Sequence, residues 1–247
     1  MKLEYLPSVG STNRWAKENY AAFGPLGAVY TMDQTAGRGR LGRRWENAAG
    51  QGLYYTAMVA QPLVQPETLP QLMSLVAAQT LAASYGIRCQ IKWPNDLLLN
   101  GKKIAGILCE STEGPAGRVW ILGIGINLAQ SAESFVAQGL PHAGSLAGEG
   151  IPVNAVQDAP ALAAALTQEL EQALRPFASQ GFAPLRAGYC AACVNLGKTV
   201  SWQQNGTPQR GVCTDVDETG RLVVKTDEGK KEIFTGEVSV QGIYGCV

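Results

Sequence analysis

The stretch GRGRLGRRW at residues 37–45 constrains the fold of this chain most, because little of it can enter a helix, a strand or a core. It contains three glycines and four arginines, namely Arg38, Arg40, Arg43 and Arg44. Glycine leaves the backbone loose, and clustered guanidinium groups repel one another. Only Leu41 and Trp45 offer apolar surface for burial. We therefore expect a loop that orders when an anion neutralises it.

The charge balance of the whole chain indicates a small anion. The chain has 20 Lys and Arg against 20 Asp and Glu residues, so its formal net charge is zero. Proteins that bind nucleic acid non-specifically usually carry a basic surplus over a whole face. Alternating Arg and Gly instead places backbone N–H groups beside guanidinium forks, which suits phosphate and carboxylate oxygens. The stretch does not match the G-x-x-x-x-G-K-[ST] pattern of a P-loop.

Length and composition indicate a globular protein of 247 residues, large enough for one main core and a small second domain. No apolar run reaches the roughly 18 residues that a transmembrane helix needs, so we expect no membrane partner. The N-terminal residues lack the pattern of a secretory signal. The six scattered cysteines are therefore expected to be reduced thiols in a cytoplasmic protein.

The hydrophobic pattern predicts a main domain of strands and helices. Strands are expected at 3–9, 28–34 and 52–60, so the Arg/Gly loop joins two strands. Helices are expected after a Ser11 or Thr12 cap, at 69–86 and at 160–178, where a proline stands at the start. Asn100 and Gly101 between two apolar runs predict a tight hairpin.

From about residue 196 the sequence changes to short strands separated by turns such as QNGTPQ, DETG and DEGK. This texture predicts a small all-β, barrel-like domain. We place the predicted domains at 1–190 and 191–247.

The segment KWPND at 92–96 brings three polar side chains to the end of a predicted strand. Trp93 and Pro94 suit structural roles, in the core and at the strand end. Lys92, Asn95 and Asp96 could bind a phosphate and a metal ion, although Asn95 and Asp96 could equally form an ordinary turn.

Two further segments could line a ligand site. Of Lys102 and Lys103, which follow the predicted hairpin, strand alternation turns one toward a ligand face of the sheet and the other away. In GIGINL at 123–128, glycines at alternate positions of an apolar strand allow close approach, and Asn127 presents an amide at that spot.

Other chemistry receives little support. Cys190 and Cys193 form a single CxxC without a second pair, which is a weak sign of zinc or redox chemistry. The chain has one histidine, His142, in a Gly/Pro-containing loop, which disfavours a Ser-His-Asp triad.

Five segments, taken in order, carry a family resemblance: STN (11–13), DQTAGRGRLGRRW (33–45), KWPND (92–96), GKKIAGIL (101–108) and GIGINL (123–128). Together they closely resemble the bacterial biotin protein ligases, also called biotin–[acetyl-CoA-carboxylase] ligases. The resemblance runs from about Ser8 to Gly242. It implies an α+β fold like that of class II aminoacyl-tRNA synthetases and biotin–lipoate ligases, with a mixed sheet, flanking helices and a C-terminal SH3-like barrel.

The resemblance implies a two-step reaction. Biotin, as substrate, reacts with ATP and Mg²⁺ to give biotinyl-5′-AMP and pyrophosphate. The biotinyl group then passes to one lysine of a biotin carboxyl carrier protein. Because the STN segment begins at residue 11, we expect the monofunctional type, without an N-terminal DNA-binding domain or operator binding. Relatives include monomers and homodimers, so the oligomeric state is left open.

The resemblance also assigns roles to residues. Catalysis is expected from Lys103, Arg38 and Arg40. The biotin site would comprise Ser11, Thr12, Asn13, Gln34, Gly37, Arg38, Gly39, Arg40 and Lys103. The ATP site would comprise Arg40, Arg43, Trp45, Lys92, Asn95 and Asn127, with Asp96 as the contact to Mg²⁺. Within these sets, the STN residues and Gln34 would bind the ureido ring, and Trp45 would stack on adenine. Gln241 stands where relatives commonly have an arginine, so contacts to ATP could be weaker here.

Three alternative functions fit parts of the sequence. A lipoate ligase shares the fold and the chemistry, but this chain lacks that family's Arg-Arg-x-x-Gly-Gly-Gly segment with a His-Asp nearby. A nucleic-acid-binding Arg/Gly arm is disfavoured by zero net charge and by the absence of interleaved aromatic residues. A biotin sensor without catalysis is the third alternative, and the presence of Lys103 argues against it.

Overall fold

The computed structural model of the protein describes residues 1–46, 48–115, 117–234 and 236–243. Its α-helices are α1 (Thr12–Asn19), α2 (Leu69–Tyr85), α3 (Ala132–Ala137), α4 (Ala155–Gln180) and α5 (Arg186–Ala192). The strands of the main sheet are β1 (Lys2–Tyr5), β2 (Leu26–Thr31), β3 (Gly52–Val59), β4 (Gln90–Lys92), β5 (Asp96–Leu99), β6 (Lys102–Gly114) and β7 (Gly117–Asn127). The strands of the second sheet are β8 (Thr199–Gln204), β9 (Thr207–Val216), β10 (Leu222–Thr226), β11 (Gly229–Ile233) and β12 (Val238–Val240). None of the described helices is both long and apolar enough to cross a bilayer.

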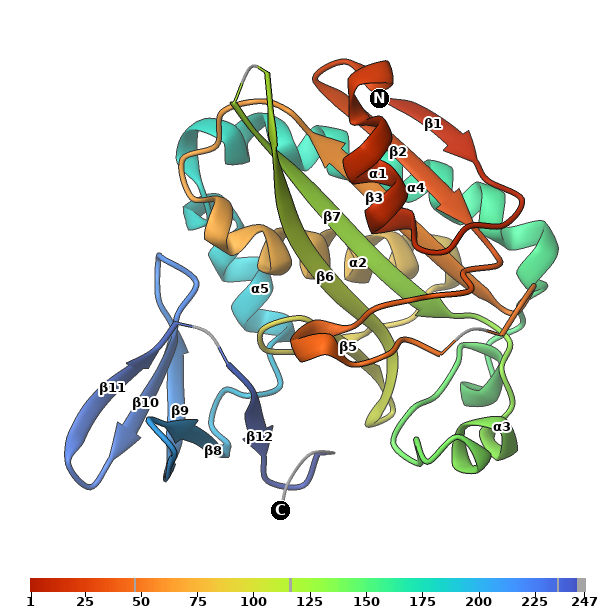
Figure 1. Ribbon diagram of the computed structural model, residues 1–247. Helices are drawn as coiled ribbons and strands as arrows, with labels where there is room; N and C mark the ends of the chain where they lie inside the picture. The colour runs from red at the N-terminus through yellow and green to blue at the C-terminus, as the bar shows by residue number, and fades with distance from the viewer. Residues whose placement is uncertain (47, 116, 235, 244–247) are drawn as a thin grey trace.

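The main sheet has seven strands in the order β1-β2-β3-β7-β6-β5-β4. The β1–β2 pair is parallel and the other pairs are antiparallel. Figure 1 shows the long strands β6 and β7 crossing the middle of the molecule, with α1 in front of the sheet and α2 and α4 behind it. The expected α+β fold with a mixed sheet is thus confirmed.

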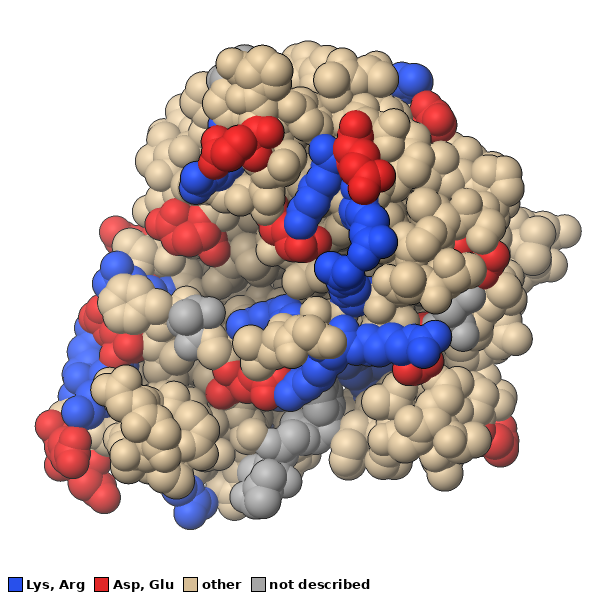
Figure 2. Space-filling model, viewed as in Figure 1, with Lys and Arg blue, Asp and Glu red and all other residues tan. Residues whose placement is uncertain are grey.

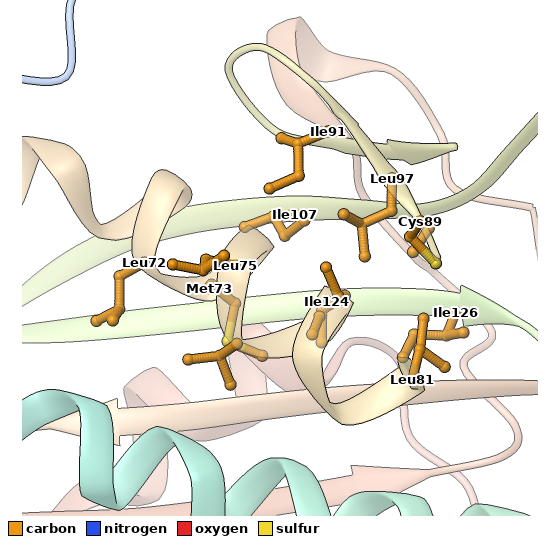
Figure 3. Close-up of a cluster of buried hydrophobic side chains, with 14 of the residues drawn as sticks. Leu72, Met73, Leu75, Leu81, Cys89, Ile91, Leu97, Ile107, Ile124 and Ile126 are labelled. Atoms are coloured by element: carbon orange, nitrogen blue, oxygen red, sulfur yellow. The ribbon is translucent and has the colours of Figure 1, made fainter. Parts of the chain in front are cut away.

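The main core fills the space between the sheet and the two long helices. Leu72, Met73 and Leu81 of α2 belong to one buried cluster with Ile107 of β6 and Ile124 of β7 (Figure 3), and each is at most 3% exposed. Gly86 ends α2 in the left-handed conformation that glycine adopts easily. The predicted helix at 69–86 and its glycine stop are therefore confirmed. Because α2 and α4 cover one face of β6 and β7 (Figure 1), only the opposite face of these strands can line a site.

Helix α1 covers only part of that other face. Ser11 caps it by accepting a hydrogen bond from the Arg14 N–H at 3.4 Å. A small second cluster, which includes Ala16, Val29 and Ile121, packs beneath it. The rest of the face, over the C-terminal half of β7, carries Gly123 and Gly125 between the core residues Leu122, Ile124 and Ile126. Strand alternation therefore turns bare backbone toward the side of the sheet that α1 leaves open.

The Asn100–Gly101 hairpin is confirmed, with both residues at positive φ. Three residues after Gly101 the β5–β6 ladder contains a bulge, because Leu97 pairs with Ala105 while Leu98 pairs with Lys103. The extra residue is Ile104, which is fully buried. A bulge reverses the alternation of faces, so Lys103 comes to lie on the same side as Gly106.

The second sheet is antiparallel, in the order β11-β10-β9-β8-β12. It lies beside α5 and below β5 in Figure 1. The C-terminal β structure predicted from residue 196 onward is confirmed. The predicted division of domains at residue 190 falls within α5 and stays a prediction.

Some predicted boundaries were wrong. The strand expected at 3–9 ends at Tyr5. The helix expected from Pro160 begins at Ala155, because the Asn154 side chain accepts a hydrogen bond from the Gln157 N–H and caps it there. Five cysteines are free thiols, namely Cys89, Cys109, Cys190, Cys193 and Cys213. Cys246 lies outside the described residues.

The α2–sheet packing predicts a large stability effect at Leu81, which is fully buried. Leu81→Ala should lower the free energy of unfolding by about 2–5 kcal/mol, because it removes apolar contacts and leaves a cavity. Urea unfolding followed by circular dichroism would measure this. The control is Gln79→Ala, an exposed position on the same helix, which should stay within about 0.5 kcal/mol of the native protein. Equal effects of the two substitutions would contradict the packing.

Candidate active site

A cavity of about 410 Å³ opens on the side of the sheet that α1 only partly covers. Its walls come from the start of α1, the Arg/Gly loop, the β4–β5 turn, strands β6 and β7, the 135–143 segment and residues 237–239 of the C-terminal region. Figure 2 shows basic side chains gathered over the hollowed middle of the molecule, with acidic ones beside them. The lining includes six basic residues and three acidic ones, so the cavity has a local positive excess.

Almost all residues predicted from the sequence line this cavity. They are Ser11, Thr12, Asn13, Gln34, Arg38, Gly39, Arg40, Arg43, Trp45, Lys92, Asn95, Asp96, Lys103 and Asn127. Gly37 does not line it. A side chain at Gly37 would lie 2.7 Å from the Gln34 amide nitrogen and the Trp45 carbonyl, so this glycine lets the loop pack closely behind the cavity.

One end of the cavity is neutral and hydrogen-bonded. The Gln34 Oε1 accepts hydrogen bonds from the N–H and the hydroxyl of Thr12, at 2.9 and 3.0 Å. The Asn13 Nδ2 donates to the Leu108 carbonyl at 3.1 Å and to Glu110 at 2.8 Å. The Thr56 hydroxyl lies 2.7 Å from the Asn13 Oδ1. The amides of Gln34 and Asn13 are therefore held in fixed orientations.

The opposite side of the cavity holds an ion pair beside a buried lysine. The Lys103 Nζ lies 2.6 Å from the Asp96 Oδ1, and the two side chains are 27% and 12% exposed. Lys92 is 9% exposed, and burial lowers its pKa while Asp96 acts in the opposite direction. A buried ammonium group gains most from a nearby anion, so this corner favours a negatively charged ligand.

The Arg/Gly loop crosses the mouth of the cavity and contacts the C-terminal region. Arg40 donates to the Asn95 side chain at 2.9 Å and to the Gly236 carbonyl at 3.1 Å. Burial lowers the pKa of Arg40, with Asp96 and Glu237 opposing. Arg43 donates to Glu237 at 2.6 Å. Of the two apolar residues in the loop, Leu41 is 73% exposed, so only Trp45 is partly buried.

The indole of Trp45 packs against two glycines of the central strands, where no side chain is in the way. A Cβ atom at Gly106 of β6 or Gly125 of β7 would lie 2.6 Å from its indole, and these two glycines pair directly across the ladder. The Lys103 Nζ lies 5.5 Å from the ring centroid. The indole Nε1 is buried and has no hydrogen-bond partner among the described residues. The glycines predicted to allow close approach thus admit the protein's own indole, and Gly123 likewise leaves space for Asn13.

Asn127 lies at the end of β7 and is 5% exposed. Its Nδ2 donates to the Gly144 carbonyl at 2.9 Å, and its Oδ1 accepts from Gln130 at 3.3 Å. The amide therefore anchors the 135–143 segment and its neighbours to the sheet while it faces the cavity.

Comparison with known proteins identifies the family. Residues 5–127 match the model of the biotin/lipoate A/B protein ligase family, and residues 196–241 match the biotin protein ligase C terminal domain. The biotin–[acetyl-CoA-carboxylase] ligase of Paracoccus denitrificans is 32% identical, with 96% of this chain and 100% of that protein covered. The bifunctional ligase/repressor BirA of Bacillus spizizenii is 31% identical, over 96% of this chain and 74% of the relative. The chain belongs to the biotin protein ligases.

The fold of this biotin protein ligase agrees with a solved structure of the family. The biotin protein ligase from Aquifex aeolicus, in complex with biotin and ATP, superimposes with a TM-score of 0.81 at 26% identity. The match covers 97% of this chain and 98% of the other. The expected membership and fold are therefore confirmed.

Sequence reasoning missed several residues of the site. Glu237, Val238 and Ser239 line the cavity although they are far from the motifs in sequence, and Gln241 does not line it. Thr56 and Glu110 hold Asn13 from outside the predicted set. Periodicity could not reveal these contacts, because it does not show which strands and loops meet in space.

The cysteine pair at 190 and 193 lies outside the cavity. Cys193 follows the C-terminal end of α5, and burial raises its pKa to about 12. Burial also raises the pKa of Cys190. Thiols that stay protonated are poor nucleophiles and metal ligands. Among the described residues there is no cluster of three or more His, Cys, Asp or Glu side chains fit to hold a metal ion.

The contact between Trp45 and the glycines can be tested in the free protein. In Gly125→Ala the new methyl group would lie 2.6 Å from the indole, so Trp45 must move toward solvent. Its fluorescence should shift to longer wavelength and be quenched more by acrylamide. In a Trp45→Phe background the same substitution should leave the emission unchanged. Gly10→Ala, where a methyl group meets open space, is the matched control. An unchanged spectrum in Gly125→Ala would show that the indole lies elsewhere.

Proposed function

We propose that this biotin protein ligase activates biotin with ATP and transfers it to a lysine of a biotin carboxyl carrier protein. In the first step a biotin carboxylate oxygen bonds to the α-phosphorus, the α–β anhydride breaks, and pyrophosphate leaves. In the second, a neutral lysine amine bonds to the biotinyl carbonyl carbon, AMP leaves, and the amine loses a proton. The relatives named above as biotin–[acetyl-CoA-carboxylase] ligases support this acceptor.

The observation that carries the proposal is the convergence of cations from three separate segments on one cavity. Arg38 and Arg40 come from the loop, Lys92 from β4, and Lys103 from the bulged start of β6. The reaction brings two anions, a carboxylate and a phosphate, into contact. At about 4 Å their repulsion is on the order of 4 kcal/mol at an effective dielectric constant of 20. Cations fixed in advance offset this repulsion and stabilise the charge that develops on phosphorus.

Lys103 and the loop arginines are assigned to the reacting atoms. The ion pair between Lys103 and Asp96 fixes the direction of the lysine ammonium group, and the bulge at Ile104 turns Lys103 toward the cavity. Lys103 would therefore hold the biotin carboxylate against the α-phosphate. Arg38 and Arg40, with the N–H groups around Gly39, would close over the carboxylate and the phosphate.

The neutral end of the cavity is assigned to the ureido ring of biotin. The ring carries no charge, so recognition must come from matched donors and acceptors. Ser11, Thr12 and Gln34 stand at the start of α1 and the adjoining loop, and Gln34 is already oriented by Thr12. Asn13 has both amide hydrogens bonded within the protein, so it would shape the pocket and accept at its Oδ1.

The nucleotide is assigned to the loop side. The indole of Trp45 lines the cavity with its other contacts on bare backbone, a geometry that suits stacking with adenine. Asn127 would read the base edge. Arg40, Arg43, Lys92 and Asn95 would contact the phosphates.

The residues present also suit a nucleotide-borne Mg²⁺. This ion is commonly bound by one or two carboxylates together with substrate phosphates. Asp96 lines the cavity beside the cations assigned to phosphate, so Asp96 would hold it. When bound, Mg²⁺ would neutralise charge on the phosphate oxygens.

The site assignment predicts a difference between adjacent lysines. Lys103→Met should lower biotinyl-5′-AMP formation by about 10²–10³-fold, the cost of removing one preorganised charge from a reaction centre. Lys102→Met is the matched control and should retain activity, because the Lys102 Nζ donates to the Pro141 carbonyl. Arg38→Ala should resemble Lys103→Met. The readouts are ATP–pyrophosphate exchange driven by biotin and blotting of a biotinylated carrier domain. Near-native rates in both site variants would refute the assignment.

The like charges of the Arg/Gly loop predict protection by ligand. Trypsin should cut near Arg38–Arg44 more slowly when biotin and MgATP are bound, because the adenylate neutralises and orders the loop. ATP without biotin and biotin without ATP are the controls. Cleavage at the same rate with and without both substrates would show that the loop does not respond to the intermediate.

A further inference from the structure

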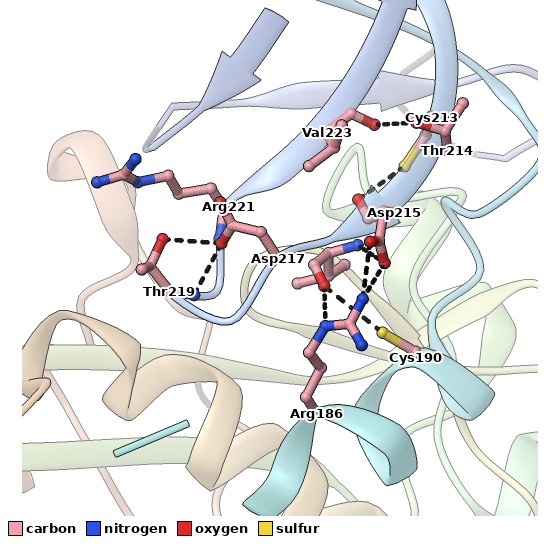
Figure 4. Close-up of polar contacts among 10 residues, drawn as sticks. Arg186, Cys190, Cys213, Thr214, Asp215, Asp217, Thr219, Arg221 and Val223 are labelled. Carbon is pink, nitrogen blue, oxygen red and sulfur yellow. Dashed lines mark hydrogen bonds and ion pairs between the residues drawn. The ribbon is translucent and has the colours of Figure 1, made fainter. Parts of the chain in front are cut away.

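The turn between β9 and β10, residues 217–221 (Figure 4), extends from the second sheet to the catalytic domain, where it contacts α2 and Trp93. Its Gly220 carbonyl accepts two hydrogen bonds from buried side chains. One comes from the Trp93 indole Nε1 at 3.0 Å and the other from the Gln71 Nε2 of α2 at 3.1 Å. Trp93 is 1% exposed and lies between Lys92 and the Pro94–Asn95 pair. The turn therefore contacts the KWPND segment through the side chain of Trp93.

The turn is rigid before any ligand binds. The Asp217 Oδ1 accepts from the N–H and the hydroxyl of Thr219, both at 2.8 Å, and from the Arg221 N–H at 3.0 Å. Gly220 has a φ of +74°, and a Cβ atom there would lie 2.8 Å from Thr68. Only glycine fits this conformation and this spacing, so the carbonyl has a fixed place.

Two further contacts hold the same junction. The Trp93 N–H donates to the Asn195 Oδ1 at 2.8 Å, and the Val194 N–H donates to the Ile91 carbonyl at 2.9 Å. Next to the turn, Arg186 of α5 donates to both carboxylate oxygens of Asp215 at 2.7 Å (Figure 4). The second sheet is thus fixed to the segment that ends with Lys92 and Trp93.

We infer that the β9–β10 turn of the C-terminal sheet positions the KWPND segment for ATP, acting through the Gly220–Trp93 hydrogen bond. Trp93 borders the cavity together with Lys92 and Asn95, but its side chain is 1% exposed and its indole N–H is bound to the Gly220 carbonyl. Its indole therefore acts as a positioning group for these two neighbours. The inference rests on the function proposed above.

The position of these neighbours explains why ATP and not biotin should respond. Asn95 accepts from Arg40 and donates its Nδ2 to the Ile107 carbonyl at 2.9 Å, so a shift of the turn moves both Lys92 and the arginine. The groups assigned to the ureido ring stand on α1 and near Gln34, and they are held by Thr56 and Glu110. None of the hydrogen bonds that hold these groups in place comes from Trp93 or Gly220. A displaced KWPND segment should therefore weaken nucleotide binding while the biotin pocket stays formed.

The test compares two donors to one carbonyl. Trp93→Phe keeps a buried aromatic ring but removes the indole N–H together with the five-membered part of the ring system. Gln71→Met removes the other hydrogen bond to Gly220 from a residue outside the KWPND segment. Each variant, as the full chain, is assayed for the KM for ATP in biotin-dependent pyrophosphate exchange, for the Kd of biotin without ATP, and for Tm.

Trp93→Phe should raise the KM for ATP by about tenfold, the factor that corresponds to loss of one hydrogen bond of ordinary net strength. Its Kd for biotin should stay within about twofold, because the substitution removes no contact to the biotin pocket. A tenfold change in that Kd would require a loss of about 1.4 kcal/mol of binding free energy. Gln71→Met should leave both values near those of the native protein, even where its Tm falls. Equal effects of the two variants on KM, or a parallel rise in the biotin Kd, would reduce Trp93 to a stabilising residue and overturn the inference.

A substitution in the turn keeps the test valid if Trp93→Phe does not fold. Asp217→Ala removes the three hydrogen bonds that one carboxylate oxygen accepts within the half-buried turn, and it changes no residue of the catalytic domain. It should raise the KM for ATP without changing the biotin Kd, and an unchanged KM would overturn the inference. If the native chain forms no biotinyl-5′-AMP at all, the proposed function itself fails, which is a different result from native activity with indifferent variants.

Discussion

Repulsion among the cations of the cavity is the constraint on which the rest of the structure depends. Arg40, Lys92 and Lys103 stand around one small volume, and burial lowers the pKa of the first two. Unpaired buried charge is costly, so the fold must supply partners that hold the cations without neutralising the whole site. Asp96 does so for Lys103, and Glu237 does so for Arg43. The positive excess that remains matches the anions the reaction must bring together.

The sheet supports this arrangement by removing side chains where they would obstruct it. Gly106 and Gly125 face each other across the β6–β7 ladder and admit Trp45, while Gly123 admits Asn13. The alternate positions, Ile124 and Ile126, fill the main core on the other face. One strand pattern therefore contributes both to stability and to the floor of the site. The bulge at Ile104 reverses this alternation in β6, and the reversal turns Lys103 to the same side as the site.

Local chemistry indicated part of the site, and the family resemblance assigned the rest, including Ser11, Thr12 and Gln34. Arginines among glycines cannot be buried without an anion, Asn100–Gly101 defines a hairpin, and alternate glycines leave a strand bare. The same reasoning could not find the bulge, since Ile104 is an ordinary strand residue. It also missed Glu237 and Gly220, which meet the motifs only after a second sheet has folded and docked. The predicted start of α4 at Pro160 was wrong because the Asn154 side chain caps the helix five residues earlier, at Ala155.

Two sets of contacts join the second sheet to the side of the cavity that we propose for the nucleotide. At the mouth, Gly236 and Glu237 bind Arg40 and Arg43. Gly220 also accepts a hydrogen bond from Trp93, next to Lys92. The neutral end of the cavity, which we propose for biotin, is built within the catalytic domain from α1, β3 and β6. Under the proposed assignment, the two substrates would therefore draw their binding energy from different parts of the chain. A change in how the second sheet docks would then alter the affinity for ATP first, because the groups proposed for the nucleotide contact that sheet.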